Sequence, residues 1–389
     1  MPGSSAEAAE LLSVLGPHMP AFGITRVGML TGLDVLGIPV AFAARPNSRA
    51  LSVTQGKSLC ADEARLGAVM EAFEHAFAER SEVLTVCRAA ARDVAGAVDL
   101  SRLKRAAHPP RREIAWARAT SLISGAERLV PLELVGLDLR SGCHSGFSAN
   151  PVSGLGLAAG TSWEAAATHA LLEVIEHDAT TALGTFGFLG GFARPVRHRR
   201  GDDAALDEIV SRLAEAGLRH QLYDLTSPGG LPVIGALIDC PDLVPGWIAF
   251  AGFACRFSPE HAAEAALLEA VQSRLTVIAG ARDDLKPSSY RGRAQYLPAA
   301  GQGGHLGDLP HGHADLRHAS PREKLARALE CAEALGAEEV LAATVGEIPG
   351  LAAVVRVIAT DLEASGFNAV TVLGRRTLQA LFAAAESGR

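Results

Sequence analysis

The sequence predicts an α+β protein in which β-sheets are covered by three long helices of one design. Two observations lead to this prediction. Strand-like passages bounded by Gly and Pro recur along the chain, and three helical segments share the related patterns AVMEAFEH, ALLEVIEH and ALLEAVQS. The chain has 389 residues, of which 48% are hydrophobic and 20% are charged. This composition is sufficient for a substantial folded core.

The composition also excludes several classes of function. The net charge is −7 and the basic run RPVRHRR stands alone, so neither nucleic acid nor an acidic membrane is the expected partner. No stretch reaches the roughly 18 to 20 apolar residues of a membrane span, and the N-terminus lacks the pattern of a secretion signal. The six scattered cysteines form no CxxC pair, which fits thiols in a reducing compartment. We therefore expect a cytoplasmic protein.

The first part of the chain is predicted to combine short strands with one long helix. Residues 1–22 are interpreted as an N-terminal segment, and residues 23–389 as a single domain. A β-rich passage ends at Pro46. A further short strand then leads through a Gly56-Lys57 turn into a helix expected from Ala61 to Arg80.

The Gly-Lys turn raises the question of phosphate binding. Gly56-Lys57-Ser58 is similar to the end of a P-loop, but Leu51 stands where that motif requires Gly, so the P-loop interpretation fails. A lysine on a turn before a helix can still meet a phosphate, because the N–H groups of a helix N-terminus also attract anions. Lys57 is thus a candidate phosphate contact, with an ordinary surface lysine as the alternative.

Three helices carry polar pairs inside otherwise apolar patterns. The second helix is predicted from Ser162 to Thr181, after a Gly-rich loop and with Thr161 or Ser162 as N-cap, and the third from Pro259 to Asp284. Residues three apart share a helix face, so each pair forms a narrow polar stripe. Neighbouring carboxylates in an apolar wall repel each other and lose hydration, so they require a cation or protons. The pairs are Glu71 and Glu74, Glu173 and Glu176, and Glu269 and Gln272.

The rest of the chain is predicted to alternate loops, helices and strands. Residues 184–191 are expected to form a Gly/Phe loop, 202–217 a surface helix, and 231–240 and 248–255 two strands. The Gly-rich segment 301–319 contains four histidines; metal binding is one interpretation, and a flexible loop near a substrate entrance is favoured. Residues 320–389 are expected to be an integral C-terminal part with a helix, a βα unit around Val340 to Thr344, a strand and a terminal helix.

The side chains of the three pairs indicate a cation site. Carboxylate and amide oxygens suit hard cations such as Mg²⁺. So many acids, together with Lys57, Arg274 and the Gly-rich loop before the second helix, indicate nucleotide phosphates as the remaining ligands. A glycosidase-like acid pair is the competing interpretation. It needs two carboxylates facing each other across a substrate and has no use for three parallel pairs, so it is not favoured.

These motifs, in this order, resemble a known family. The passages ITRVGMLTGLDVLGIPV, RPNSRALSVTQGKSLCADEARLGAVMEAFEH, SGLGLAAGTSWEAAATHALLEVIEHDA and ALLEAVQSR resemble the YcaO superfamily, ATP-dependent enzymes that activate peptide-backbone amides, over about Gly23 to Glu363. The resemblance implies a fold with sheets and helices around a central Mg²⁺ and ATP site. It implies that five glutamates bind Mg²⁺, namely Glu71, Glu74, Glu173, Glu176 and Glu269. The remaining ATP-binding residues that it implies are Gln272, Lys57, Arg274, Ser153, Gly156 and His177.

The chain departs from the family pattern at several positions. Gly67 and His75 stand where the first helix commonly carries Ser and Arg, and His177 replaces the usual Arg of the second helix. Leu155 stands in the Gly-rich loop where many members carry Asn. Histidine cannot reproduce the bidentate fork of a guanidinium group. We therefore expect remodelled ATP contacts.

The resemblance also implies a reaction and a partner. The passages GITRV and RPN resemble members that work with a TfuA-like partner and form thioamides, and the chain ends LFAAAESGR without the Pro-rich tail common in azoline-forming members. We expect ATP to phosphorylate a backbone amide oxygen of a precursor peptide or protein, and external sulfide to displace the phosphate. Azoline formation is the first alternative and a catalytically inactive peptide-binding scaffold the second. No nucleophile of the protein is required, and a homodimer stays open.

Overall fold

The computed structural model describes most of the chain as two compact units. The described residues are 5–103, 113–140, 152–186, 192–239, 249–286, 303–309, 316, 319–363, 377, 378 and 382. The first unit comprises Met1–Phe73, Arg194–Thr226 and Pro232–Asp315, and the second comprises Glu74–Ala193, Ser227–Leu231 and Leu316–Arg389. The expectation of one domain over 23–389 stays a prediction.

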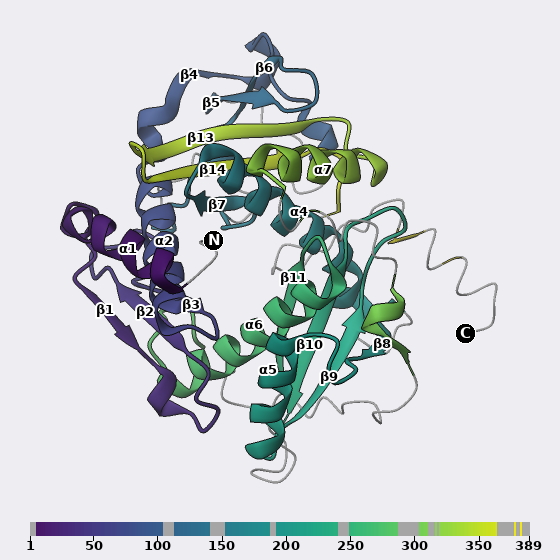
Figure 1. Ribbon diagram of the computed structural model, residues 1–389. Helices are drawn as coiled ribbons and strands as arrows, with labels where there is room; N and C mark the ends of the chain where they lie inside the picture. The colour runs from purple at the N-terminus through teal and green to yellow at the C-terminus, as the bar shows by residue number, and fades with distance from the viewer. Residues whose placement is uncertain are drawn as a thin grey trace. The chain divides into compact units, whose positions relative to one another are not determined.

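The first unit contains two sheets and their covering helices (Figure 1). Its helices are α1 (Ser5–Leu15), η1 (Gly16–Phe22), η2 (Thr31–Leu33), most of α2 (Ala61–Ala78), α5 (Ala204–Glu215), α6 (Pro259–Ala279) and η7 (Leu306–Asp308). Its strands are β1 (Arg26–Met29), β2 (Val40–Ala44), β3 (Val53–Lys57), β8 (Arg194–Arg197), β9 (Arg219–Asp224), β10 (Val233–Asp239), β11 (Phe250–Cys255) and β12 (Gly304–His305).

The smaller sheet of this unit is antiparallel, with the strand order β1-β2-β3. β3 therefore lies at its edge. The Thr54 hydroxyl on β3 donates to the Ala68 carbonyl of α2 at 2.8 Å, and α6 also packs against β3. The edge strand thus lies against two of the three helices that carry the polar pairs.

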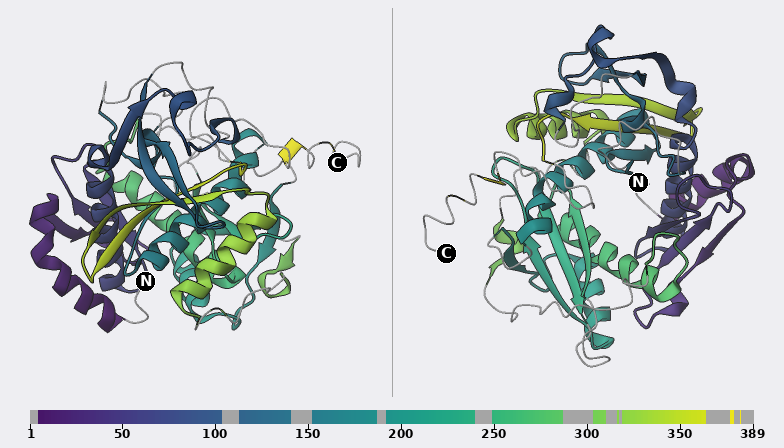
Figure 2. Two further views of the ribbon diagram at one scale, coloured as in Figure 1. Left: turned by 90° about the horizontal axis from the view of Figure 1, so that it is seen from above. Right: turned by 180° about the vertical axis from the view of Figure 1, so that it is seen from behind.

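The larger sheet has the order β11-β10-β9-β8-β12, and only the β8–β12 pair is parallel. α6 packs against β10 and β11, and α5 packs against β9 and α6, so both helices cover the same face. The views in Figure 2 show these strands as one twisted layer. The core between sheet and helices is aliphatic, with Ile209, Ile234, Ala266 and Leu267 fully buried. Burial of each Ile or Leu side chain of this kind stabilises the unit by about 1.5–3 kcal/mol.

The second unit is built around one six-stranded sheet. Its path is β4-β5-β13-β14-β7, and β6 pairs with β5. The strands are β4 (Thr85–Ala89), β5 (Ile114–Ser121), β6 (Glu127–Pro131), β7 (Leu157–Gly160), β13 (Val340–Ile348) and β14 (Ala352–Ala359). The helices are the end of α2, η3 (Ser81–Leu84), η4 (Ala91–Asp93), η5 (Leu100–Arg102), α3 (Leu132–Val135), α4 (Trp163–Phe186) and α7 (Pro321–Ala334). α4 packs against β14 and β7, and α7 packs against α4.

The three long helices that the sequence predicted are present, with shifted ends. α2 ends slightly earlier than expected, and α4 continues beyond Thr181. α6 stops before Gly280, whose left-handed φ of 61° ends the helix, so the expected helical residues up to Asp284 lie outside it. Ser162 is the N-cap of α4, because its hydroxyl accepts from the Ala165 N–H at 3.2 Å.

Two local predictions are wrong. Gly56 and Lys57 lie within β3 and not on a turn, because they pair with β2 across the sheet. The βα unit expected around Val340 to Thr344 is instead the start of an antiparallel hairpin, in which β13 turns at Gly350 (φ 72°) into β14. Both strands are mostly apolar, and the pairing of two apolar strands cannot be predicted from short-range periodicity.

Three predictions, for two loops and the C-terminal helix, fall only partly on described residues. The first residues of the expected loop 184–191 are the helical end of α4, and residues 187–191 lie outside the described residues. Within 301–319, residues 304–308 form β12 and η7, so this part is not a free loop; three of the four histidines, His311, His313 and His318, lie outside the described residues. Most of the expected terminal helix also lies outside them.

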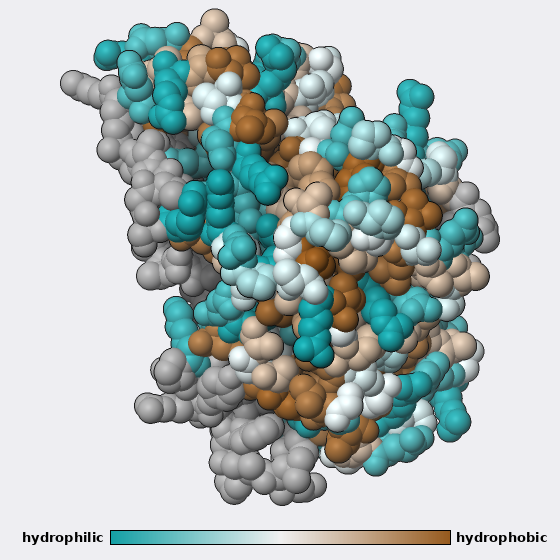
Figure 3. Space-filling view, turned by 90° about the vertical axis from the view of Figure 1, so that its left-hand side faces the viewer, coloured by the Kyte–Doolittle hydropathy of each residue, from teal (hydrophilic) through white to brown (hydrophobic). Residues whose placement is uncertain are grey.

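The surface that Figure 3 presents shows hydrophobic side chains interspersed with hydrophilic ones. Among the described residues, the most exposed large apolar ones are Val83 at 79% and Val35 at 74%, one in each unit. Isolated apolar side chains of this kind are common on protein surfaces. Among the described helices, none combines the length and the apolar composition needed to cross a membrane.

Candidate functional site

The three helices present their polar pairs as the sequence predicted. The flanking apolar residues are buried, including Val69, Phe73, Leu171, Ile175, Leu267 and Val271. The paired residues themselves are only half-buried, so they form the narrow polar stripe of each helix. Glu71 and Glu74 lie on α2, Glu173 and Glu176 on α4, and Glu269 and Gln272 on α6. Each stripe is positioned by the burial of the apolar surface around it.

In the first unit, four of the predicted site residues are linked. The Lys57 Nζ at the end of β3 lies 3.2 Å from Glu269 Oε2 on α6. The backbone N–H of Gln55 donates to Glu71 Oε2 at 3.0 Å, and the Gln55 side-chain oxygen lies 3.5 Å from Gln272 Nε2. The side chains of Lys57, Gln272, Glu71 and Glu269 therefore lie along β3.

Arg274 has a different surrounding. It is 5% exposed, and its Nε and Nη2 donate to the two carboxylate oxygens of Asp34 at 2.9 and 3.1 Å. Its guanidinium also lies over the Phe250 ring, 5.8 Å from the centroid. This fork–fork pair holds the η2 turn against α6, and the phosphate contact of Arg274 stays a prediction. Sequence reasoning did not find its partner, since Asp34 lies 240 residues away.

In the second unit, Glu74 is held by the strand next to the Gly-rich loop. The backbone N–H of Ala159 on β7 donates to Glu74 Oε2 at 3.1 Å. β7 is an edge strand of its sheet, as β3 is of the smaller sheet in the first unit. The outward N–H groups of edge strands need acceptors. Glu71 and Glu74 each supply one carboxylate oxygen to such a group.

The Gly-rich loop has a fixed backbone. Gly156 has a φ of 72°, and a Cβ there would lie 2.3 Å from the Val357 carbonyl oxygen and 3.0 Å from Val174 on α4. Its own carbonyl accepts from the Val357 N–H at 2.6 Å. Only glycine combines this φ with such a close approach. β7 separates this loop from α4, whereas the sequence suggested a direct passage from loop to helix.

The side chain of Arg356 on β14 holds the same loop. It is 2% exposed, and its guanidinium donates to the carbonyl oxygens of Leu155 at 2.6 Å and Ser153 at 3.0 Å. It also donates to those of Val135 at 3.3 Å and Gly136 at 3.4 Å. The signal for this residue was present in the sequence, since a single arginine interrupts the apolar strand LAAVVRVIAT.

The two histidines that replace family arginines differ in exposure. His75 on α2 is 6% exposed, whereas His177 on α4 is half-buried. The His177 carbonyl accepts from the hydroxyl groups of Thr180 and Thr181, at 3.3 and 2.8 Å. His177 therefore lies beside the Glu173 and Glu176 stripe, where two threonine hydroxyl groups hydrogen-bond to its carbonyl group. His75 lies in the packed core.

A strand glycine lets each of the three helices approach a sheet closely. A Cβ on Gly56 of β3 would lie 2.1 Å from an α2 carbonyl oxygen, and one on Gly252 of β11 would lie 2.2 Å from an α6 carbonyl oxygen. A Cβ on Gly160 of β7 would lie 2.5 Å from an α4 backbone nitrogen. Any larger residue would push strand and helix apart. Sequence reasoning missed this shared feature, because the spacing from glycine to acidic pair differs in the three cases.

The donor chemistry fits Mg²⁺, and no closed metal cluster is present among the described residues. No three His, Cys, Asp or Glu side chains of the described part are arranged as ligands of one ion. The predicted ligands nevertheless offer only oxygen atoms, half-buried beside apolar walls, and one oxygen of Glu71 and of Glu74 is already oriented by a backbone N–H. Oxygen donors of this kind are those that Mg²⁺ prefers. The metal role of the five glutamates stays a prediction.

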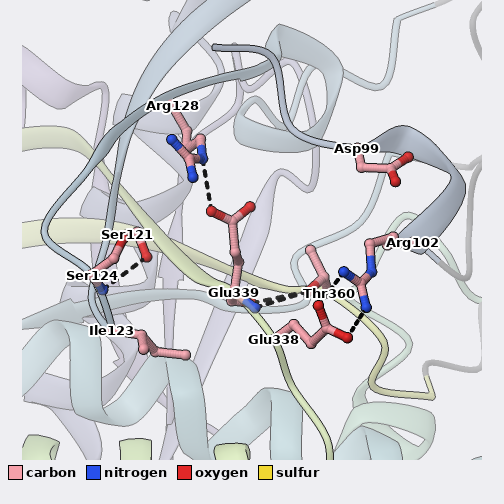
Figure 4. A pocket seen from close by; sticks show the side chains of 9 residues that line it. All are labelled: Asp99, Arg102, Ser121, Ile123, Ser124, Arg128, Glu338, Glu339 and Thr360. Atoms are coloured by element: carbon pink, nitrogen blue, oxygen red, sulfur yellow. Dashed lines mark hydrogen bonds and ion pairs between the residues drawn. The ribbon is translucent and has the colours of Figure 1, made fainter.

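The second unit also contains a charged cavity of about 370 Å³ (Figure 4). Arg102 is paired with Glu338 and with Asp361, and Arg128 Nε lies 2.7 Å from Glu339 Oε1. The hydrogen bond from Arg102 lowers the pKa of the Glu338 carboxyl group. Both guanidiniums are thus neutralised, and none of the predicted site residues lines this cavity. Its lining residues are Asp99, Arg102, Ser121, Ile123, Ser124, Arg128, Glu338, Glu339 and Thr360.

Comparison with known proteins identifies the family. The model of the YcaO cyclodehydratases, described as ATP- and Mg²⁺-binding, matches residues 55–363. A protein of Rhizobium leguminosarum bv. trifolii, named for its place in the tfuA 3′ region, is 34% identical over 400 residues, covering 96% of this chain and 91% of that protein.

Solved structures share the fold. YcaO from Methanopyrus kandleri, bound with AMPPCP and Mg²⁺, superposes with a TM-score of 0.71 at 21% identity, covering 94% of this chain and 96% of that chain. A heterocyclase in complex with substrate and cofactor gives a TM-score of 0.71 at 15% identity. The alignment covers 94% of this chain and 52% of the heterocyclase, so this chain spans about half of that protein.

The matched fold and the acid-bearing helices define a class of ATP-dependent enzymes that modify peptides. The chain belongs to the YcaO family. The resemblance inferred from the sequence is thereby confirmed, as are the mixed α and β architecture and the ATP and Mg²⁺ dependence of the family.

Proposed function

We propose that this protein uses ATP to activate a backbone amide of a ribosomally made peptide or protein, and that external sulfide then converts the amide into a thioamide. The observation that carries the proposal is the set of half-buried polar pairs on three apolar helices, in which the two acids of the α2 pair are oriented by edge-strand N–H groups. Family membership supplies the ATP-dependent class. The thioamide product goes beyond that class.

In this proposal the acidic stripes bind the metal and the nucleotide. The metal ligands are Glu71, Glu74, Glu173, Glu176 and Glu269, with Gln272 as a neutral oxygen ligand. Bound Mg²⁺ supplies neutralisation of the phosphate charge that develops during phosphoryl transfer. Lys57, paired with Glu269, contributes a further positive charge next to the acids. Ser153, Gly156 and His177 are the further residues proposed to contact the nucleotide.

The proposed reaction has two steps. The amide oxygen of the substrate attacks the γ-phosphorus of ATP, so ADP leaves and the amide carries a phosphate on its oxygen. Hydrosulfide then adds to the activated carbon, and inorganic phosphate leaves with the former amide oxygen. The protein contributes mainly positioning and electrostatic stabilisation, which suits a site without an evident nucleophile.

Support for sulfide as the nucleophile comes from the tfuA-linked relative. That protein is named for the tfuA 3′ region and matches nearly the whole chain. We propose a TfuA-like protein as the partner, acting in substrate recognition or sulfide delivery.

The test is a reconstitution with the full chain, the TfuA-like protein, a candidate peptide, Mg·ATP and sulfide. We expect ADP and a peptide heavier by the difference between sulfur and oxygen. Glu173→Gln and Glu176→Gln should abolish both products, because each removes one charge from the α4 stripe. Glu164→Gln, in the first turn of the same helix, is the matched control and should keep them. ADP and product formed equally by all variants would refute the assigned site.

Azoline formation is the alternative, and the family description as cyclodehydratases favours it. A Cys, Ser or Thr side chain of the substrate would then attack, and the peptide would become lighter by one water. The product mass separates the two reactions in the same assay. A catalytically inactive scaffold is the second alternative, suggested by His75, His177 and Leu155, which replace residues common in the family. Such a scaffold would bind peptide without ADP release, and Glu173→Ala would leave peptide binding unchanged.

A further inference from the structure

The Gly-rich loop before β7 contains a tight turn with glycine at the position that requires it. The Leu157 N–H donates to the Gly154 carbonyl oxygen at 2.8 Å, which closes the turn over four residues. Gly156 is the third of them and has a φ of 72°, as a type II turn requires. A side chain there would also collide with the Val357 carbonyl oxygen. The backbone conformation of the loop is therefore strongly restricted.

Arg356 holds two peptide groups of this loop by their oxygen atoms. Its Nη1 atom lies 2.6 Å from the carbonyl oxygen of Leu155 and 3.0 Å from that of Ser153. The side chain is 2% exposed, and it also donates to the carbonyl oxygens of Val135 and Gly136. A buried guanidinium held by two segments cannot turn away, so both loop carbonyl groups face it.

The orientation of these carbonyl groups sets the direction of two N–H groups. No peptide bond among the described residues is cis, and in a planar trans peptide the N–H group points opposite to the carbonyl oxygen. The N–H groups of Gly154 and Gly156 belong to the peptide planes whose carbonyl groups Arg356 holds. Both N–H groups therefore point away from the guanidinium.

These two N–H groups have no hydrogen-bond acceptor in the described part of the chain. Gly156 is buried, and buried backbone N–H groups are almost always paired with protein, water or a ligand. The space around Gly154 is open, since a Cβ there would meet no atom within 4 Å. The loop thus keeps two donors for a group that the described residues do not supply.

The loop lies beside two predicted metal ligands of the second unit. Gly156 packs against Val174 on α4, the residue after Glu173, with 3.0 Å between a Val174 methyl group and the position of a Cβ. Two residues after the turn, the Ala159 N–H donates to Glu74. Outward N–H groups of a loop attract anions, and phosphate oxygens that share an Mg²⁺ ion with these acids are the acceptors that this position favours.

We infer that Arg356 is a positioning residue, which turns the N–H groups of Gly154 and Gly156 toward phosphate oxygens of the nucleotide. This inference rests on the proposed function, because it acts in the same nucleotide site. It also gives a reason for Leu155, which stands where many family members carry asparagine. Backbone donors bind phosphate without help from a side chain, so leucine is compatible with this role. Arg356 itself is buried and does not contact the nucleotide.

The direct test uses the wild-type full chain with ¹⁵N-labelled glycine. On saturation with the Mg²⁺ complex of a non-hydrolysable ATP analogue, the amide signals of Gly154 and Gly156 should move downfield and show scalar coupling to ³¹P. The reason is that each N–H then donates to a phosphate oxygen. Gly125 is the matched control, because its N–H already donates to the Ser121 carbonyl oxygen, and its signal should show no such coupling.

Two variants then test the role of Arg356. Arg356→Met should weaken binding of the analogue at least about tenfold and abolish both glycine couplings, since a hydrogen bond to a charged group contributes about that factor. Arg356→Lys keeps the charge without the planar fork, so its affinity should be intermediate. Arg118→Met, at an exposed arginine of β5 in the same sheet, is the matched control and should bind like the wild type. Near-UV circular dichroism before each titration restricts the comparison to folded protein.

Glycine couplings that are absent in the saturated wild type, or that persist unchanged in folded Arg356→Met, would overturn the inference. Glu173→Gln separates this result from a failure of the proposed function. If Glu173→Gln weakens Mg²⁺-dependent binding while the wild-type glycine signals do not respond, the nucleotide site stands and the inference is wrong. If the analogue does not bind to the wild type, or binds equally well to Glu173→Gln, the assigned nucleotide site itself is wrong.

Discussion

Replacing Arg356 by methionine is expected to destabilise the second unit and to release the Gly-rich loop. The guanidinium is 2% exposed and joins β14 to two separate segments, the Gly-rich loop and the end of α3. Its contacts with the carbonyl oxygens of Leu155 and Ser153 measure 2.6 and 3.0 Å, whereas the contacts with the α3 end are longer. Methionine keeps most of the aliphatic stem and removes all of these donors.

The magnitude follows from the two short bonds. Hydrogen bonds from a charged group contribute about 1.5–3 kcal/mol each, so losing these two lowers the free energy of unfolding by about 3–6 kcal/mol. Solvent does not screen these bonds, because the side chain is almost completely buried. Arg356→Lys should lose an intermediate amount, since an ammonium group cannot reproduce a planar fork that reaches several carbonyl groups.

The assay is urea unfolding combined with hydrogen exchange measured on peptides from the loop and from β7. Exchange should accelerate most around residues 153–160, where the released backbone lies. Arg118→Met on β5 is the matched control, because Arg118 is 62% exposed and pairs only with the equally exposed Glu127 among the described residues. Its effect should stay within about 0.5 kcal/mol. An Arg356→Met variant as stable as this control, or with exchange unchanged in the loop, would refute the reasoning.

Three further outcomes are expected. Arg274→Met should lower the free energy of unfolding by about 3–5 kcal/mol in urea, because it leaves the Asp34 carboxylate buried without its partner; a loss below about 1 kcal/mol would contradict this. Gly156→Ala should lower the melting temperature, since its Cβ would lie 2.3 Å from a β14 carbonyl oxygen, whereas Gly154→Ala, with no atom within 4 Å, should be tolerated. Burial, reinforced by a neighbouring histidine, lowers the pKa of His220, so the unfolded chain takes up that proton first and stability falls as the pH drops below about 6.5. His220→Gln should flatten the melting temperature between about pH 8 and about pH 5, and a profile parallel to the wild type would count against this assignment.

The candidate site shows how far short-range patterns reach. The spacing of Glu173 and Glu176 within an apolar helix predicted a half-buried stripe, because side chains three residues apart share a face regardless of the rest of the fold. The same spacing could not show that Arg274 pairs with Asp34, since the two lie 240 residues apart in the chain. Lys57 was expected on a turn between a strand and a helix, and the β2 pairing that places it in β3 is not visible in the local sequence.

By itself, the sequence determined the existence of the three acid-bearing helices, the oxygen-rich chemistry of their stripes and the family to which the chain belongs. These properties depend on periodicity and on ordered motifs, which local contacts preserve. The tertiary structure alone decided which residues hold those acids in place. The backbone N–H groups of Gln55 and Ala159 hold Glu71 and Glu74, and the Arg356 guanidinium holds the Gly-rich loop. Such contacts form only when segments distant in sequence are brought together by burial of their apolar faces.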